Sequence, residues 1–148
     1  MNIHGLGAQT GFIVLLVVLI VVSACFIACG RRNRTPDTVF NVGPEEFSRR
    51  VSDMARSDGD IILLDVRTQA EYNEAHIAGS VLIPYPSRDF EARVEGLDPG
   101  KTYLLYCRSG NRSSSAAGVL SKLGYEKLYN LKGGINAWRA SGLPVTTE

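Results

Sequence analysis

Residues 102–113 form the stretch TYLLYCRSGNRS, in which an apolar run is followed directly by a polar segment that begins with a cysteine. Its first part, residues 102–106, is mostly apolar, as expected of a strand buried on both faces of a sheet. The six residues that begin with Cys107 are too polar for a protein core. Residues 113–123 then have the apolar spacing of an amphipathic helix. The stretch therefore predicts a strand, a short loop headed by Cys107, and a helix.

Strand-like and helix-like segments alternate on both sides of this stretch. Residues 61–66 form a second continuous apolar run and predict another buried strand. Further elements are expected over shorter segments: strands at 39–42, 80–83 and 127–131, and helices at 44–54, 68–75, 89–94 and 135–142. Thr68 and Ser87 are expected to cap two of these helices. The alternation predicts an α/β fold, with a parallel sheet covered by helices on both faces.

Cys107 is the candidate nucleophile. Ligands of parallel sheets bind at the carboxyl ends of the strands, where the prediction places this cysteine. The following helix N-terminus offers unpaired N–H groups and partial positive charge, so the thiol pKa is expected to be lowered. Gly110 lets the loop curl, Arg108 and Arg112 add positive charge, and the serines at 113–115 can donate hydrogen bonds. An inert buried cysteine is the alternative, and the polarity of the loop argues against it.

An apolar segment of 18 residues, 12–29, precedes the predicted domain and contains Ser23 as its only clearly polar residue. As a helix it spans roughly 27 Å, about the thickness of a hydrocarbon core. The sequence therefore predicts a short tail (1–11), a transmembrane anchor (12–29), a linker (30–38) and one domain (39–148). The basic residues that start at Arg31 place this domain in the cytoplasm by the positive-inside rule.

A lipoprotein signal is the alternative for this segment. Val22-Ser23-Ala24-Cys25 is similar to a bacterial lipobox, in which Cys25 carries the lipid. The domain then lies outside the cytoplasm. The absence of a charged residue before Arg31 and the apolar residues after Cys25 count against this interpretation. Both alternatives associate the protein with a membrane.

The charges and cysteines of the chain restrict the kinds of partner and metal site that are expected. The chain has 16 basic and 15 acidic residues, all from Arg31 onward, so the predicted domain is close to neutral and nucleic acid is not expected as a partner. Cys107 is the only cysteine after residue 30, which excludes a disulfide scaffold there. Cys25 and Cys29 have no nearby histidine, so no metal site is expected.

Several short motifs follow one another along the chain. They are Leu64-Asp65-Val66-Arg67 with Glu71-Tyr72, His76-Ile77-Ala78-Gly79-Ser80, Tyr106-Cys107-Arg108-Ser109-Gly110-Asn111-Arg112-Ser113, Leu123-Gly124-Tyr125, and Leu131-Lys132-Gly133-Gly134-Ile135-Asn136-Ala137-Trp138. Each is weak alone. Together and in this order, they make residues 39–144 resemble a single rhodanese (sulfurtransferase) domain. The resemblance implies a rhodanese-like fold with about five parallel strands.

The resemblance also implies a mechanism. The Cys107 thiolate attacks the sulfane sulfur of a small anionic donor such as thiosulfate and holds it as a persulfide. The N–H groups of the following loop cradle the terminal sulfur: Arg108, Ser109, Gly110, Asn111 and Arg112. A thiol or another nucleophilic acceptor, which can belong to a protein, then removes the sulfur. No metal or organic cofactor is implied.

Charged and aromatic residues around the loop have mainly structural interpretations. Asp65 and Arg67 match family positions near the loop and are expected to pair and hold the end of their strand. Glu71 is expected to pair with Arg67 from the next helix. His76 and Trp138 are expected to be structural residues.

Two other functions are compatible with this pattern. Dual-specificity phosphatases of the same fold also use a cysteine at the head of an anion-binding loop, but with five residues between Cys and Arg. Here four residues separate Cys107 from Arg112, a tighter loop that suits one sulfur atom better than a phosphoryl group. A sulfur carrier or regulatory binding module with little turnover is the second alternative.

Overall fold

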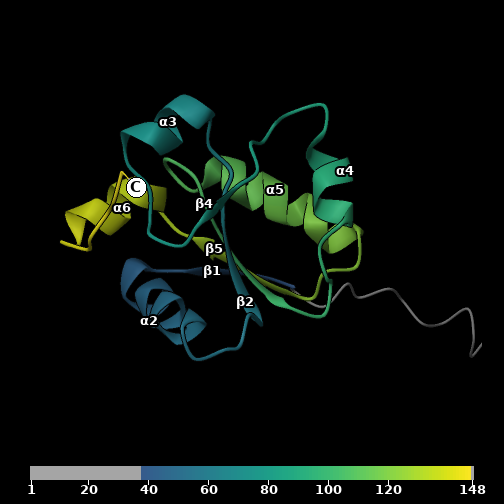
Figure 1. Ribbon diagram of the computed structural model, residues 1–148, viewed down its shortest axis with the longest axis horizontal. Coiled ribbons are helices and arrows are strands. Elements are labelled where there is room, and N and C mark those ends of the chain that lie inside the picture. Colours follow the sequence, from purple (N-terminus) through teal and green to yellow (C-terminus); the bar gives the residue numbers. More distant parts are fainter. Residues whose placement is uncertain (1–37, 148) are drawn as a thin grey trace, which may run out of the picture. The chain divides into compact units, whose positions relative to one another are not determined.

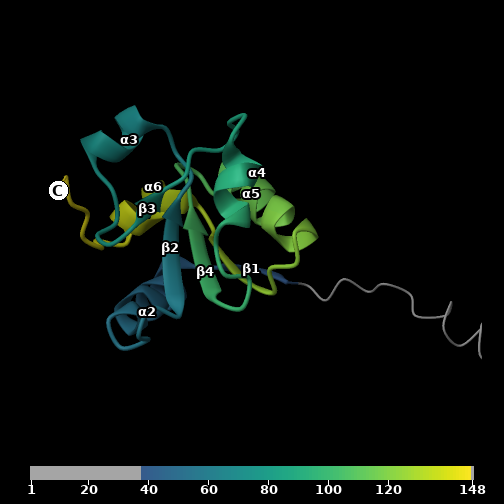
Figure 2. The ribbon, with the colours of Figure 1, turned by 45° about the vertical axis from the view of Figure 1, so that its right-hand side comes forward.

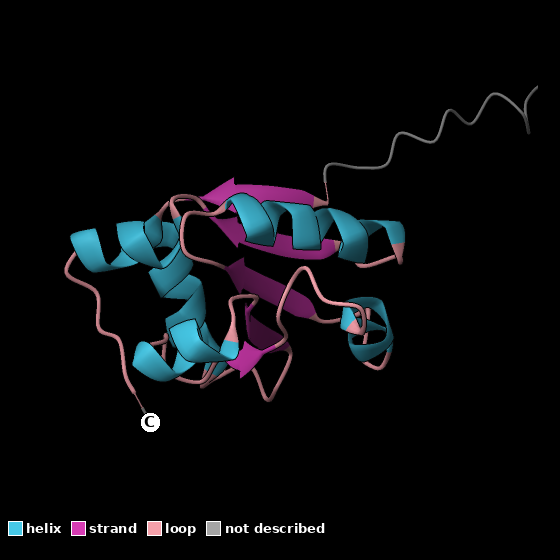
Figure 3. Ribbon diagram, turned by 90° about the horizontal axis from the view of Figure 1, so that it is seen from above, coloured by secondary structure: helices cyan, strands magenta, loops and turns pink. Residues whose placement is uncertain are grey.

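The computed structural model describes residues 38–147, which belong to one compact unit, Asp37–Glu148. Its centre is a sheet of five parallel strands in the order β1-β5-β4-β2-β3. The strands are β1 (Val39–Val42), β2 (Ile61–Asp65), β3 (Val81–Leu82), β4 (Thr102–Tyr106) and β5 (Lys127–Leu131). Their arrows point the same way in Figure 3. The predicted α/β fold with five parallel strands is confirmed.

Helices cover both faces of the sheet (Figures 1 and 2). They are α2 (Pro44–Met54), α3 (Gln69–Glu74), α4 (Phe90–Glu95), α5 (Asn111–Lys122) and α6 (Gly134–Ala140). Phe47 of α2 and Trp138 of α6 bury against one face. Phe90 of α4 and Leu120 of α5 bury against the other.

The central strand β4 supplies both cores because side chains alternate along a strand. Tyr103 and Leu105 pack toward α4 and α5, whereas Leu104 and Tyr106 pack toward α2 and α6. All four side chains are fully buried. The alternation therefore holds β4 from both sides and fixes the position of the next residue, Cys107.

Some local predictions hold and others fail. Thr68 caps α3 in a capping box with Glu71, as the sequence predicts. The predicted cap by Ser87 is wrong, because its hydroxyl donates to the carbonyl oxygen of Pro84 and Asp89 occupies the cap position of α4. Strand β3 has two residues rather than four.

The predicted anchor over residues 12–29, with Cys25, lies outside the described residues and stays a prediction. Within residues 38–147, no helix is both long enough and apolar enough to cross a membrane.

Candidate active site

Cys107 lies directly after β4, and α5 begins four residues later at Asn111. The loop between them curls through Gly110, whose φ of 93° is in the left-handed region. A Cβ atom there would lie 3.0 Å from the carbonyl oxygen of Leu131, so both backbone angle and space require glycine. The curl brings the N-terminus of α5 beside the sulfur of Cys107.

The sulfur atom of Cys107 is fully buried and accepts hydrogen bonds from the loop and the helix. The backbone N–H of Gly110 donates to Sγ at 3.1 Å, and the hydroxyl of Ser113 lies 3.4 Å from Sγ. Burial acts to raise the pKa of the Cys107 thiol, but the hydroxyl of Ser113 and backbone N–H groups of Ser113, Ser109 and Gly110 outweigh it. The pKa is therefore lowered from its usual value. The arrangement favours a thiolate held in a cradle of donors.

The N-terminus of α6 holds the Cys107 loop through hydrogen bonds to its backbone carbonyl groups. The backbone N–H of Ile135 donates to the carbonyl oxygen of Cys107 at 2.8 Å, and that of Asn136 donates to the carbonyl oxygen of Arg108 at 3.2 Å. Gly134 allows this close approach, since a Cβ atom there would lie 2.6 Å from the carbonyl carbon of Arg108. These bonds hold the loop carbonyls at α6, away from the donors that face the sulfur.

From the sequence, Gly133 and Gly134 indicate only a tight turn within a family motif, and this support by α6 was not anticipated. The two adjacent glycines before a short helix were the available signal, because a helix N-terminus without side chains can approach another backbone closely. Both have positive φ, 79° and 59°.

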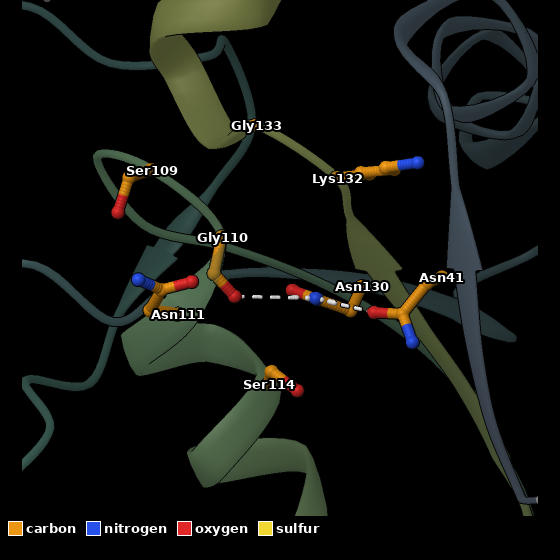
Figure 4. A pocket seen from close by; sticks show the side chains of 8 residues that line it. All are labelled: Asn41, Ser109, Gly110, Asn111, Ser114, Asn130, Lys132 and Gly133. Atoms are coloured by element: carbon orange, nitrogen blue, oxygen red, sulfur yellow. Dashed lines mark hydrogen bonds between the residues drawn. The ribbon is translucent and has the colours of Figure 1, made fainter.

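A side-chain amide holds the loop from the neighbouring strand (Figure 4). Nδ2 of Asn130, on β5, donates to the carbonyl oxygen of Gly110 at 3.2 Å and to Oδ1 of Asn41 at 2.7 Å. Ser109 and Asn111 line an open cavity of about 420 Å³ beside this contact. These two loop residues therefore contribute backbone and surface, with no side-chain bond to Cys107.

Arg112 closes the loop by pairing with α3. Its guanidinium donates to both carboxylate oxygens of Glu71, at 2.9 and 2.7 Å. This bond from Arg112 is the main reason that the pKa of Glu71 is lowered to about 2; burial opposes it, and bonds from Thr68 add to it. The predicted pair of Glu71 with Arg67 is therefore wrong.

Arg67 pairs with Asp65, two residues earlier on the same strand end, which confirms the pair that the sequence predicts. Nε and Nη2 of Arg67 donate to the Asp65 carboxylate at 2.6–3.0 Å, and Nη2 also donates to the carbonyl oxygen of Ala75 at 2.7 Å. Both side chains are almost fully buried. The pair joins the end of β2 to the end of α3, next to the loop.

The remaining candidates separate into exposed and structural residues. The side chain of Arg108 is exposed and makes no ion pair within residues 38–147. His76 is buried, stacks on Tyr72 with ring centroids 3.7 Å apart, and bonds through Nδ1 to the carbonyl oxygen of Tyr72. Trp138 is buried and donates to the carbonyl oxygen of Pro144 at 2.8 Å. In the part of the chain that the structure describes, no group of three or more His, Cys, Asp or Glu residues is arranged to hold a metal ion.

Known proteins match this chain in sequence. A sulfurtransferase of Allochromatium vinosum is 34% identical over 107 residues, which are 72% of this chain and 94% of that protein. The thiosulfate:glutathione sulfurtransferase of Saccharomyces cerevisiae is 30% identical over 116 residues, covering 70% and 83% of the two chains. These relatives support a sulfurtransferase type of enzyme.

Solved structures and a family model agree with the sequence relatives. The solution structure of a rhodanese-like domain from Anabaena sp. superposes with a TM-score of 0.60 at 27% identity, covering 73% of this chain and 79% of that one. A rhodanese-related protein from Thermoplasma volcanium gives 0.53 at 28% identity, covering 74% and 99%. The model of the rhodanese-like domain matches residues 48–141, which include every described element from α3 to α6 and the whole Cys107 loop. The chain belongs to the rhodanese-like family.

Proposed function

We propose that this protein is a membrane-anchored sulfurtransferase in which Cys107 takes a sulfane sulfur from a donor such as thiosulfate and passes it to a nucleophilic acceptor. The observation that carries the proposal is the environment of Sγ. A sulfur atom that accepts bonds from the N–H of Gly110 and the hydroxyl of Ser113, with a lowered thiol pKa, is prepared to act as a thiolate.

Two displacements make up the reaction. The thiolate of Cys107 attacks the outer sulfur of thiosulfate, a new S–S bond forms on Cys107, and sulfite leaves with the electron pair of the old S–S bond. An acceptor thiolate or cyanide then attacks the terminal sulfur, and the Cys107 thiolate leaves. The donors that face Sγ stabilise negative charge on the persulfide as they do on the thiolate. The protein contributes the Cys107 thiolate and the hydrogen-bond donors of the loop to this reaction.

Thiosulfate and a small thiol are proposed as test substrates because relatives carry these activities in their names. The yeast relative is a thiosulfate:glutathione sulfurtransferase, and a Coxiella burnetii protein that is 36% identical over 81 residues is a thiosulfate sulfurtransferase.

The membrane location rests on the sequence of residues 12–29. We place the domain in the cytoplasm, with the basic residues from Arg31 at the membrane surface. Mass spectrometry of the protein extracted from membranes tests this. A full-length chain supports a spanning helix, and a chain that starts at lipid-modified Cys25 supports the lipoprotein alternative, with the domain outside the cytoplasm.

Burial of Cys107 favours a second candidate function, a sulfur carrier. Its side chain is fully buried, so a specific protein partner has to open the site if small molecules do not reach it. In that case Cys107 holds a persulfide and small acceptors remove it only slowly.

One experiment separates the two functions. The full-length chain, purified in mild detergent, is given thiosulfate and cyanide, and thiocyanate is measured over time beside the Cys107→Ser variant. Continuous production that depends on Cys107 supports the enzyme. A single stoichiometric sulfur transfer without turnover supports the carrier, and no transfer at all contradicts both.

A further inference from the structure

Two of the arginines around the Cys107 loop are paired with carboxylates. Among residues 38–147, Arg112 is paired with Glu71 and Arg67 with Asp65. Arg67, Arg108 and Arg139 line a cavity of about 230 Å³ beside the loop, together with the carboxylates Glu71 and Glu74. Counting both ion pairs, four arginines face three carboxylates. Lys132 adds a further positive charge at the neighbouring cavity, which Ser109 and Asn111 also line, and a thiolate on Cys107 offsets part of this excess before any donor arrives.

Several hydrogen bonds hold the ion pair between Arg112 and Glu71 in place. Glu71 accepts two bonds from Arg112 and, through Oε2, two more from the backbone N–H and the hydroxyl of Thr68, each at 3.0 Å. The same carboxylate thus caps α3 and holds Arg112. Its side chain is 26% exposed and that of Arg112 is 32% exposed, so the pair is partly shielded from water.

Arg112 lies close to the nucleophile, because it stands between Gly110 and Ser113, which both donate hydrogen bonds to Sγ of Cys107. After the hydrogen bond to Glu71, the opposing effect of burial and the charge of Glu71, the negative charge of Cys107 is a further cause that raises the pKa of Arg112. An uncompensated Arg112 would therefore attract anionic donors. Paired with Glu71, it keeps other N–H groups free to orient a donor but adds little net charge.

We propose that Glu71 is a specificity-determining residue, which neutralises Arg112 so that the site prefers sulfane donors with no more than one negative charge over the thiosulfate dianion. The preferred class comprises hydropersulfides and thiosulfonates. The inference rests on the proposed sulfur transfer and adds the charge of the donor.

Sulfur transfer from a singly charged donor needs no added oxidant or reductant. The Cys107 thiolate attacks the outer sulfur of methanethiosulfonate, an S–S bond forms on Cys107, and methanesulfinate leaves with the electron pair of the broken bond. Methanethiosulfonate has the same reacting S–S bond as thiosulfate and one negative charge less. The two compounds are therefore a matched pair of probes.

The test compares kcat/KM for thiosulfate with kcat/KM for methanethiosulfonate, with cyanide as acceptor, on the full-length chain in detergent. The ratio in each variant is compared with the wild-type ratio, which cancels the different reactivities of the two donors. Glu71→Gln removes the charge but keeps a residue that can form the capping box. We expect the ratio to rise about fivefold, through KM for thiosulfate, and the effect to shrink at high salt.

Arg112→Gln and the double variant supply the decisive comparison. Arg112→Gln leaves the charge of Glu71 unbalanced, so the ratio should fall below that of the wild type. The double variant Glu71→Gln/Arg112→Gln restores the balance, and its ratio should return to within about twofold of the wild-type ratio. A purely structural role for the pair predicts no such restoration, because the double variant has lost both partners.

Glu74→Gln is the matched control. Glu74 belongs to the same helix and the same cavity, but it is exposed and makes no ion pair within the described residues. We expect it to change the ratio less than Glu71→Gln does, by under about twofold, because solvent screens an exposed charge.

The outcomes separate this inference from the proposed function. An unchanged ratio in Glu71→Gln, an equal change in Glu74→Gln, or a double variant as low as Arg112→Gln overturns the role of Glu71. If circular dichroism shows that one single variant is misfolded, the expected rise or fall of the kcat/KM ratio in the other single variant still tests the proposal. Wild-type protein that forms no persulfide with either donor overturns the proposed function instead.

Discussion

The backbone N–H of Ile135 donates to the carbonyl oxygen of Cys107 at 2.8 Å, which ties the nucleophile to the first turn of a helix 28 residues further along the chain. This hydrogen bond keeps the carbonyl oxygen of Cys107 directed at α6 and away from Sγ. The N–H and O–H donors of the loop therefore stay directed at Sγ. The site therefore depends on two helix N-termini: α5 faces the sulfur, and α6 holds the loop carbonyls.

Gly134→Ala tests the support from α6. A Cβ atom at this position would overlap the Arg108 carbonyl group, and φ of 59° is also unfavourable for alanine. We expect the free energy of unfolding to fall by about 2–4 kcal/mol and kcat/KM to fall more than about tenfold. Urea unfolding and thiocyanate production measure the two effects.

Gly118→Ala is the control for that substitution. Gly118 lies inside α5, and a Cβ atom there meets nothing within 4 Å. Alanine should stabilise the helix by about 0.5–1 kcal/mol and leave activity unchanged. Equal effects of the two substitutions would contradict the role given to the contact of Gly134 with the loop.

Ser113→Ala tests the cradle itself. Its hydroxyl lies 3.4 Å from Sγ and is the largest of the causes that lower the pKa of Cys107, so its removal should raise that pKa. The pH at which iodoacetamide alkylation of Cys107 reaches half its maximal rate should therefore move upward. This midpoint is a better measure than the rate itself, because burial of Cys107 limits access at every pH.

Ser115→Ala provides the comparison for the cradle. Ser115 lies in the same helix but is exposed, and its substitution should leave the midpoint where it is in the wild type. A midpoint that stays the same in Ser113→Ala would show that the hydroxyl does not stabilise the thiolate.

Asp65→Asn should damage folding more than chemistry. The variant leaves the buried guanidinium of Arg67 without its counter-charge, which typically costs about 3–5 kcal/mol. Asp53→Asn breaks the exposed pair with Arg56 and should cost less than about 1 kcal/mol. Urea unfolding of both variants checks this difference, and similar losses would mean that the pair of Asp65 and Arg67 does not hold the ends of β2 and α3 together.

Acid should weaken the contact of Arg112 with Glu71. The pKa of Glu71 is about 2 in the folded protein and near 4.5 when unfolded, so the folded state favours the ionised form. The resulting stability is fully present above about pH 4.5 and is lost as the pH falls toward 2. For a pair that is partly exposed, we expect about 1–2 kcal/mol.

The comparison with Glu71→Gln isolates this contribution. The difference in unfolding free energy between wild type and variant should be present at pH 7 and shrink steadily below pH 4.5. A difference that does not depend on pH over this range would show that ionisation of Glu71 does not stabilise the fold.

Local patterns account for what the sequence predicted well. The apolar run of β4, the polar loop after Cys107 and the amphipathic helix behind it are all readable over a dozen residues. The capping box of α3 is equally local, because Thr68 and Glu71 are three residues apart. The cradle for Sγ could therefore be predicted as a type of site, together with its nucleophile.

Contacts between distant segments account for what was missed. The predicted pair of Asp65 and Arg67 is confirmed, but the additional predicted pair of Arg67 with Glu71 is not present, because Arg67 turns back to the strand end. That leaves Glu71 free for Arg112, 41 residues away. The approach of α6 to the loop is also long-range, and nothing in the local pattern around Ile135 indicates which carbonyl it meets.

In the proposed reaction sulfur passes through a persulfide on Cys107, which a measurement of the intact mass of the protein detects directly. Full-length protein is incubated with thiosulfate, desalted and weighed, and peptide mapping then distinguishes Cys107 from Cys25 and Cys29. We expect one added sulfur atom per chain, located on Cys107, absent in Cys107→Ser and removed by cyanide. No added sulfur, or sulfur only on Cys25 or Cys29, would contradict it.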